Sequence, residues 1–424
     1  MNLRYNVNDK MPLGPLLMYG TQWLVVTIPI IVVIVAAVGK MQGLNTAEMT
    51  FYTQKMFVLA GISLLIQLLF GHRLPVVVGP ASLFLVGMAS AGAGNENAVY
   101  TSIICGGVII ALLSHMSIIR SISKLFTGRI ITVVLVLIAL TLTPTIMNLM
   151  IPTGVNSLPI LGFDLIFLTA IIVLNKLLKG VWKSTTMVWA ILFGTASYAL
   201  LFGLGDVQIS WLSGGDMASH LFISGLDFNP GVLLAFFFCY IAFFINEFGS
   251  VQTVEHSVSD THELGTTRRG MFFTGLMNMF TGLFGVLGTV DYSMSPGVIL
   301  NTGCASRYAM IPTAVGLILI GFCAPIVALF AFMPQPVMGV LLLYLMSSQL
   351  GSGLRLIHTD KLIHDFDDAF TVAFPVMLGV IISFLPEEIS ASIPALLRPV
   401  LSNGFVMGVI AVLFIEHCIN RKNK

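Results

Sequence analysis

Long apolar segments follow one another along almost the whole chain, and few charged residues interrupt them. A membrane-spanning helix needs about 20 apolar residues, and most of the segments reach that length. Charged residues make up only 9% of the chain, against roughly 25% in soluble domains. This pattern excludes a soluble enzyme and a nucleic-acid-binding protein, and the net charge of +1 indicates no polyanionic partner. It predicts a polytopic, all-α membrane protein embedded in a lipid bilayer.

The sequence contains fourteen apolar segments, and the distribution of basic residues supports that number. If the N-terminus is cytoplasmic, all of the 20 Lys and Arg residues except Lys40, Lys55 and Arg398 fall on the cytoplasmic side, as the positive-inside rule requires. We therefore expect fourteen transmembrane segments in the cell's inner membrane, with both termini in the cytoplasm. The segments are residues 12–39, 50–71, 79–94, 98–117, 129–151, 159–178, 184–205, 231–252, 270–288, 295–304, 308–332, 335–351, 368–385 and 393–418.

The third and tenth segments are too short to span a bilayer, and they resemble each other. Residues 79–87 and 295–303 both begin with small or proline residues, continue through an apolar run and close on glycine. Each is the third segment of a half that contains seven, and an odd number of spans inverts the second half relative to the first. Such paired, interrupted segments are typical of the binding site of a transporter. We expect a 7+7 inverted repeat with two half-helices.

A half-helix that begins inside the membrane has N–H groups without intrahelical partners, and its dipole adds partial positive charge there. Two such ends that face each other would bind carbonyl oxygens or an anion. The alternative is a pair of loops that dip into the membrane only to pack. The expected backbone donors are Ala81, Ser82, Leu83, Ser293, Met294 and Ser295.

These stretches resemble the nucleobase–ascorbate transporter family, also called nucleobase:cation symporter type 2, over nearly the whole chain. Residues 74–80 (LPVVVGP) are similar to the lead into its third helix, residues 270–288 to its ninth helix, and residues 334–339 (PQPVMG) to the start of its twelfth. Gln22 stands where the family has a glutamine on its first helix. The resemblance implies a homodimer formed through a gate domain of residues 129–205 and 335–418, which packs on a core domain of residues 12–117 and 231–332.

The tenth segment departs from the family's signature. Gly297 and Thr302 fit it, whereas Met294 replaces a side chain that usually binds the base and Ser295 replaces the usual Asn. Ser82 stands where members often have an aromatic residue that stacks on the ring. We therefore expect either weaker nucleobase binding or a more apolar ring as substrate. One phenylalanine of the eighth segment is a candidate replacement for the stacking residue: Phe236, Phe237, Phe238, Phe243, Phe244 or Phe248.

Carboxylates inside predicted spans are functional candidates because they are costly in lipid. Glu247 stands where the family carries a substrate-binding glutamate, but an alignment on Gly249 places Asn246 there instead. Neighbours on a helix point about 100° apart, so one of the two faces the site; we favour Glu247, which accepts N–H groups and carries a proton. The alternative for Glu247 is a solvated or Lys-paired carboxylate. Asp291 either caps the tenth segment or carries a proton or cation, and Gln22 contacts either substrate or another helix.

The sequence thus predicts a secondary active transporter rather than an enzyme. It would import a uracil- or purine-like nucleobase together with protons by alternating access, with sodium as the alternative coupling ion. No metal site or cofactor is expected, and the absence of a Walker-type sequence argues against ATP as the energy source. An anion transporter or channel on the same inverted-repeat scaffold is the first alternative. A membrane enzyme or a sensor that binds without transport is the second.

Overall fold

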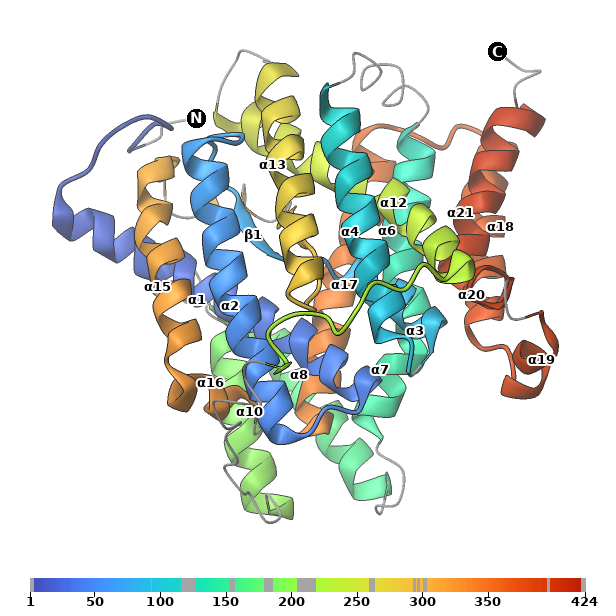
Figure 1. Ribbon diagram of the computed structural model, residues 1–424, viewed down its shortest axis with the longest axis horizontal. Helices are drawn as coiled ribbons and strands as arrows, with labels where there is room; N and C mark the ends of the chain where they lie inside the picture. Colours follow the sequence, from blue (N-terminus) through green and yellow to red (C-terminus); the bar gives the residue numbers. More distant parts are fainter. Residues whose placement is uncertain are drawn as a thin grey trace.

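The computed structural model describes residues 4–420 with several gaps, and the described residues are mostly helical. Most of the long helices run side by side, up and down in the view of Figure 1. The tenth predicted segment, residues 295–304, lies largely outside the described residues. The gaps are residue 93 and residues 116–126, 152–156, 179–185, 204–218, 259–263, 293–294, 296–297, 300–302, 332 and 395–396.

Eight helices of the described residues are long and apolar enough to cross a membrane. A bent pair, α15 (Met310–Phe322) and α16 (Ala324–Ala331), adds a ninth if its two parts form one span. The chain is therefore a multi-pass helical membrane protein, although these spans are fewer than the fourteen predicted segments. The eight are α1 (Leu13–Gln42), α2 (Thr46–Leu69), α4 (Glu96–His115), α6 (Gly128–Thr141) continued by α7 (Thr143–Met150), α8 (Ser157–Leu177), α12 (Pro230–Val258), α17 (Gln335–Thr359) and α18 (Phe366–Ser383).

The remaining helices are shorter or more polar. α10 (Thr186–Phe202) and α21 (Gly404–Phe414) are apolar but shorter than a full span. α13 (Leu264–Leu283) has the length of a span but carries Arg268, Arg269 and several threonines. The other short elements are α3 (Leu83–Ala91), α19 (Glu387–Ser392), α20 (Arg398–Leu401), η1 (Arg307–Ala309) and η2 (Ile415–Ile419).

Two short strands pair in the interior, mostly in the stretches just before the third and tenth predicted segments. β1 (Val77–Pro80) and β2 (Thr289–Tyr292) pair antiparallel, with Val78 opposite Asp291 and Pro80 opposite Thr289. The expectation of an all-α chain is wrong here. Extended backbone at this depth needs hydrogen-bond partners inside the protein, and each strand supplies them to the other. β1 directly precedes α3 in the chain, so the paired strand fixes where that helix begins (Figure 1).

Glycines allow the helices around this sheet to approach to backbone contact. A Cβ atom on Gly275 of α13 would lie 2.6 Å from the backbone nitrogen of Ala111 and 2.7 Å from the carbonyl oxygen of Gly107, both on α4. Small residues at such crossings are typical of helix pairs in membranes. The close α4–α13 contact therefore depends on the absence of side chains at these positions.

Gly275→Ala should lower the thermal stability of the protein, because the added methyl group forces the two backbones apart. Overpacking of this kind costs about 1–3 kcal/mol, which exceeds the roughly 1 kcal/mol that alanine gains over glycine in a helix. Gly265→Ala is the control on the same helix, because a Cβ there would meet nothing within 4 Å. Thermal unfolding of the detergent-purified protein measures the difference. Equal midpoints for the two variants would contradict the packing described.

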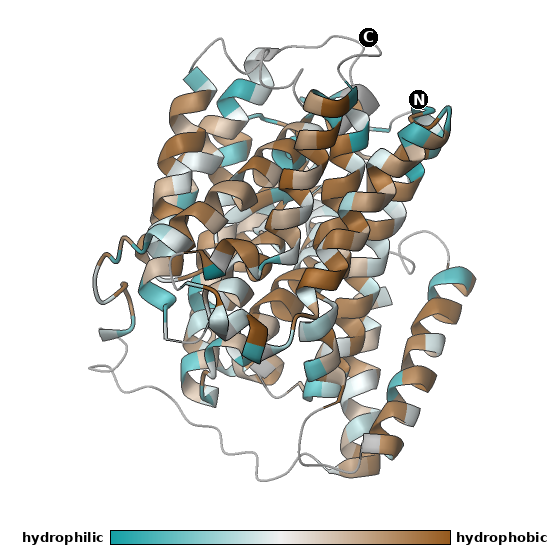
Figure 2. Cartoon of the chain, turned by 90° about the vertical axis from the view of Figure 1, so that its right-hand side faces the viewer, coloured by the Kyte–Doolittle hydropathy of each residue, from teal (hydrophilic) through white to brown (hydrophobic). Residues whose placement is uncertain are grey.

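The outer surface of the helices is apolar, as expected for lipid contact. Brown, hydrophobic residues dominate the helices in Figure 2, and teal residues gather mostly towards their ends and in the loops. Large apolar side chains stand exposed on α8 and α10, among them Ile166, Leu192, Phe193 and Leu200. Exposure of this surface to water would be unfavourable, whereas in a bilayer the apolar side chains contact the lipid hydrocarbon.

Candidate substrate site

A central cavity of about 460 Å³ lies between the start of α3 and the helices α1, α12 and α17. This volume lies in the range of small-molecule sites. No charged side chain lines the cavity within the part of the chain that the structure describes. Its polar lining consists of Ser82, Asn175, Thr186, Asn246, Tyr292, Tyr344, Ser348, Gln349 and Ser352.

The start of α3 forms part of the wall of this cavity. Ser82 and Leu83 line the cavity, and their N–H groups have no partner among the described residues. The N–H of Ala81 donates instead to the carbonyl oxygen of Gly288, at 2.8 Å. This contact continues the β1–β2 pairing and uses the N–H group of Ala81, which is buried. Ala81 is therefore not available as a donor to a ligand.

The structure distinguishes between the two candidates on α12. Asn246 lies on the cavity wall, and its Nδ2 donates to the carbonyl oxygen of Asp291 at 3.4 Å. Glu247 is fully buried and points away from the cavity into the protein. In this conformation Asn246, and not the favoured Glu247, therefore faces the cavity. The neighbouring residue faces the cavity because one step along a helix turns a side chain by about 100°.

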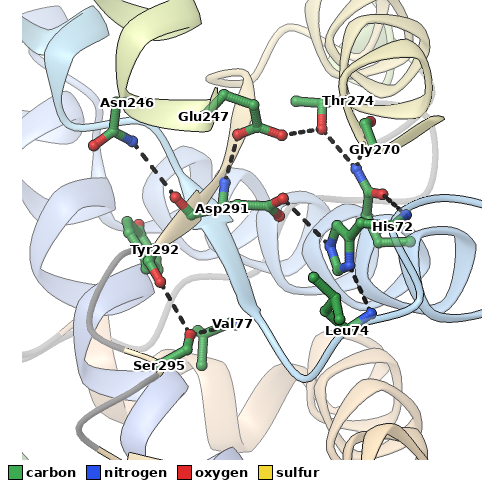
Figure 3. A network of polar contacts seen from close by, with 11 residues as sticks. His72, Leu74, Val77, Asn246, Glu247, Gly270, Thr274, Asp291, Tyr292 and Ser295 are labelled. Carbon is green, nitrogen blue, oxygen red and sulfur yellow. Dashed lines mark hydrogen bonds and ion pairs between the residues drawn. The ribbon is translucent and has the colours of Figure 1, made fainter. Parts of the chain in front are cut away.

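Glu247 belongs to a directed hydrogen-bond network behind the cavity wall (Figure 3). The N–H of Asp291 donates to Glu247 Oε2 at 2.9 Å, and the Thr274 hydroxyl bonds to Oε1. Gln67 Nε2 donates to Thr274 Oγ1 at 2.6 Å and to the carbonyl oxygen of Gly270 at 3.0 Å. Because Thr274 Oγ1 accepts from Gln67, its own proton points to Glu247. The carboxylate thus accepts two hydrogen bonds.

The carboxylate of Asp291 lies beside His72, a residue that sequence reasoning missed. The distance from His72 Nε2 to Asp291 Oδ2 is 3.3 Å, and both side chains are buried. The backbone N–H of Leu74 donates to His72 Nδ1 at 2.9 Å, so the proton of a neutral ring lies on Nε2, towards Asp291. Asp291 therefore faces His72, and the start of the half-helix that it was expected to cap lies outside the described residues.

The other predicted contacts lie elsewhere. The hydroxyl of Ser295 accepts the N–H of Val77 and donates to the carbonyl oxygen of Tyr292, both at 3.0 Å; it therefore supports the two strands. Gln22 is buried in α1 away from the cavity wall. Ser293 and Met294 lie outside the described residues.

The aromatic lining of the cavity comes from β2 and α17 rather than from α12. Tyr292 and Tyr344 line the cavity. The ring of Phe243 stacks on Phe84 of α3, with centroids 5.3 Å apart and planes 4° apart, and Phe236 packs against the same ring. These phenylalanines hold α3 on α12 and do not reach the cavity.

The fold defines a multi-pass helical membrane protein, and the cavity among its helices has the size of a small-molecule site. Residues 14–388 match the Permease family, so the chain belongs to that family, the nucleobase–ascorbate transporters that its motifs resemble. Its members are permeases rather than enzymes.

Two relatives of this chain are similar to it over most of their length. The xanthine permease of Bacillus subtilis is 23% identical, with 96% of this chain and 94% of the relative covered. The uric acid permease PucJ of the same organism is also 23% identical, over 91% of this chain and 88% of the relative. Among solved structures, the transmembrane domain of the cyanobacterial bicarbonate transporter BicA matches with a TM-score of 0.63 and 15% identity, over 89% of this chain and 98% of that chain. That match concerns the fold alone.

Proposed function

We propose that this protein is a secondary active transporter that carries a nucleobase across the cell membrane with protons, by alternating access. The observation that carries the proposal is a largely apolar central cavity, whose described lining adds uncharged polar groups, in a chain related to xanthine and uric acid permeases. Nucleobases are neutral or weakly acidic planar rings whose edges alternate carbonyl and N–H groups. A cavity with amide, hydroxyl and backbone N–H groups suits such edges better than a charged one, because each polar edge can be paired.

Asn246 would take the place proposed above for Glu247 in substrate recognition. Its amide both donates and accepts, so it can pair with an adjacent carbonyl and N–H of the base. The N–H groups of Ser82 and Leu83 would receive a second carbonyl oxygen, and the rings of Tyr292 and Tyr344 offer apolar faces to the heterocycle. The two tyrosine rings would thus replace the aromatic stacking residue that many family members have at the position of Ser82.

Glu247 and Asp291 would carry the coupling proton. Both are buried side chains that belong to one network, and two carboxylates close together in a membrane protein cannot both be charged without a large cost. The link to the cavity is short, because Asn246 bonds to the Asp291 carbonyl oxygen while the Asp291 N–H bonds to Glu247. A substrate that moves Asn246 would therefore move the backbone on which the carboxyl pair depends. Sodium is the alternative ion.

The transport cycle would move the core domain against the gate domain. The resemblance assigns the core to residues 12–117 and 231–332 and the gate to residues 129–205 and 335–418, in a 7+7 inverted repeat of fourteen segments. The cavity supports this division, since Ser82 and Asn246 belong to the proposed core while Asn175 and Gln349 belong to the proposed gate. The exposed apolar side chains of α8 and α10 suit a homodimer through the gate as well as lipid. We place both termini in the cytoplasm and the protein in the inner membrane.

The second candidate function is anion transport, which the similarity in fold to a bicarbonate transporter favours. An anion would require compensating positive charge in the cavity, and none of the described lining residues carries it. The backbone N–H groups of Ser82 and Leu83 would have to suffice.

Ligand-dependent thermal stability distinguishes the two functions. Xanthine, uric acid, hypoxanthine or uracil at 100 times its dissociation constant should stabilise the purified protein by about 2.7 kcal/mol. Bicarbonate and sulfate should leave the unfolding midpoint unchanged. Stabilisation by an anion and by none of the four bases would contradict nucleobase binding and favour the second candidate.

A further inference from the structure

A second cavity, of about 760 Å³, lies on the far side of the Asp291–Glu247 pair and shares no lining residue with the central cavity. We call it the N-terminal cavity, because residues 6–9 form part of its wall. Backbone hydrogen bonds hold this segment in place: Arg307 N–H donates to Val7 at 3.0 Å and Ala305 N–H to Tyr5 at 2.9 Å. The carboxyl pair thus has one cavity on each side.

His72 separates the N-terminal cavity from Asp291. It lines that cavity, yet its side chain is fully buried and Nε2 lies 3.3 Å from Asp291 Oδ2. The backbone N–H of His72 donates to Gln67 Oε1 at 3.3 Å, and its Cβ lies against Gly270, where an added Cβ would be 3.1 Å away. The ring is therefore held in one orientation, as Figure 3 shows.

The orientation of the ring prevents it from passing a proton onward. A histidine relay accepts a proton on one ring nitrogen and releases one from the other. Here the Nδ1 lone pair already accepts the N–H of Leu74, and a backbone amide cannot take up a proton in return. The remaining N–H, on Nε2, faces Asp291. In this state the Nε2 N–H of His72 lies 3.3 Å from the carboxylate without forming a hydrogen bond to it, and the ring has no free proton-accepting site.

The charges around the N-terminal cavity oppose proton entry as well. Among the described lining residues there are three arginines and two carboxylates, so this part of the wall carries a positive excess that repels a further positive charge. The groups are Asp9, Arg73, Glu255, Arg269 and Arg307. On the inner side of the ring, Asp291 and Glu247 are the titratable neighbours, from β2 and α12.

We propose that His72 is a positioning residue that closes the Asp291–Glu247 pair to protons from the N-terminal cavity. Protons then reach and leave the pair only through the central cavity, along the route of the substrate. The inference rests on the proposed proton coupling and adds the reason why such a pair would not leak.

The test is proton leak in liposomes that contain the purified protein and no substrate. A potassium gradient with valinomycin drives protons inward, and a trapped pH dye reports them. Liposomes with the wild-type protein should show little proton leak. His72→Ala should raise the leak at least roughly tenfold, which corresponds to a barrier lowered by about 1.4 kcal/mol. His72→Gln should keep the proton leak at the wild-type level, because its side chain still fills the position of the ring and places an N–H group near Asp291. His115→Ala is the control, because His115 packs on Phe272 away from the network. Its proton leak should equal that of the wild type.

A relay gives the opposite pattern. If His72 conducts protons, both His72→Ala and His72→Gln lose base-driven proton uptake and neither leaks, which would overturn the proposal. Equal leak in His72→Ala and wild type would overturn it too. If His72→Ala does not fold, His72→Gln decides alone, since retained coupling fits a barrier and lost coupling fits a relay. Failure of the proposed proton coupling would be recognised separately: the wild-type protein would then bind a base but move no protons with it.

Discussion

Replacing Asn246 by leucine should weaken nucleobase binding by about 1–3 kcal/mol, or roughly 5- to 150-fold in Kd. Leucine has a similar size, so the cavity keeps its shape while the polar edge of the base loses its partner. The variant also loses the 3.4 Å hydrogen bond to the Asp291 carbonyl oxygen. Isothermal titration of the purified protein with the base that stabilises it best measures the change.

Asn97→Ala is the matched control for this variant. Asn97 donates to the Ser224 hydroxyl at 2.8 Å in an exposed place and does not line the central cavity, so its removal should leave the Kd unchanged. An unchanged Kd in Asn246→Leu would contradict the assignment of the central cavity. If Glu247→Gln then abolished binding, the carboxylate rather than the amide would contact the base, in a conformation other than this one.

Glu247→Gln should abolish accumulation of the base in a proton gradient while base exchange continues. The amide keeps the size of the carboxyl group but cannot take up and release a proton. It loses one of the two hydrogen bonds from Thr274 and Asp291, because an amide has only one accepting oxygen. Uptake into liposomes with an imposed pH gradient measures accumulation, and counterflow without a gradient measures exchange.

Glu247→Asp is the control for the loss of the carboxyl group itself, and it should retain part of the accumulation. Wild-type accumulation in Glu247→Gln would show that Glu247 is not the coupling group and would leave Asp291 as the candidate. An anion transporter behaves differently again: its flux should persist or rise in Glu247→Gln, since the variant removes a negative charge near the path.

The membrane class and the family were predictable from the sequence because both depend on local features. Segment length and the scarcity of charge define a multi-pass helical protein without any tertiary information. The motifs at residues 74–80 and 334–339 are contiguous, so a resemblance can be recognised directly. The number of spans is harder to predict, since α13 has the length of a span but includes Arg268 and Arg269, and α10 is apolar but short.

The β1–β2 pair was not predictable in the same way. Val76, Val77 and Val78 continue an apolar run, and such a run is equally compatible with a buried helix or strand. The strand is decided by its partner more than 200 residues away, Thr289–Tyr292. The same pairing explains why Ala81 was wrongly expected to offer its N–H group.

On α12 the sequence favoured Glu247, whereas the neighbouring Asn246 faces the central cavity of the structure. A one-residue shift exchanges Asn246 and Glu247, and no periodicity in the apolar α12 favours one register. His72, Thr274 and Gln67 were missed because their contacts join separate elements. A polar Gln67 near the end of a predicted span, followed closely by His72, was the one available signal.

Proton movement driven by a nucleobase gradient in liposomes tests the proposed symport most directly. With wild-type protein and a trapped pH dye, external addition of the base that stabilises the protein should acidify the lumen in a saturable manner, and bicarbonate should not drive uptake through the protein. A base that binds and crosses the membrane without acidification would contradict proton coupling. If no base crosses and labelled bicarbonate does, nucleobase transport itself is contradicted.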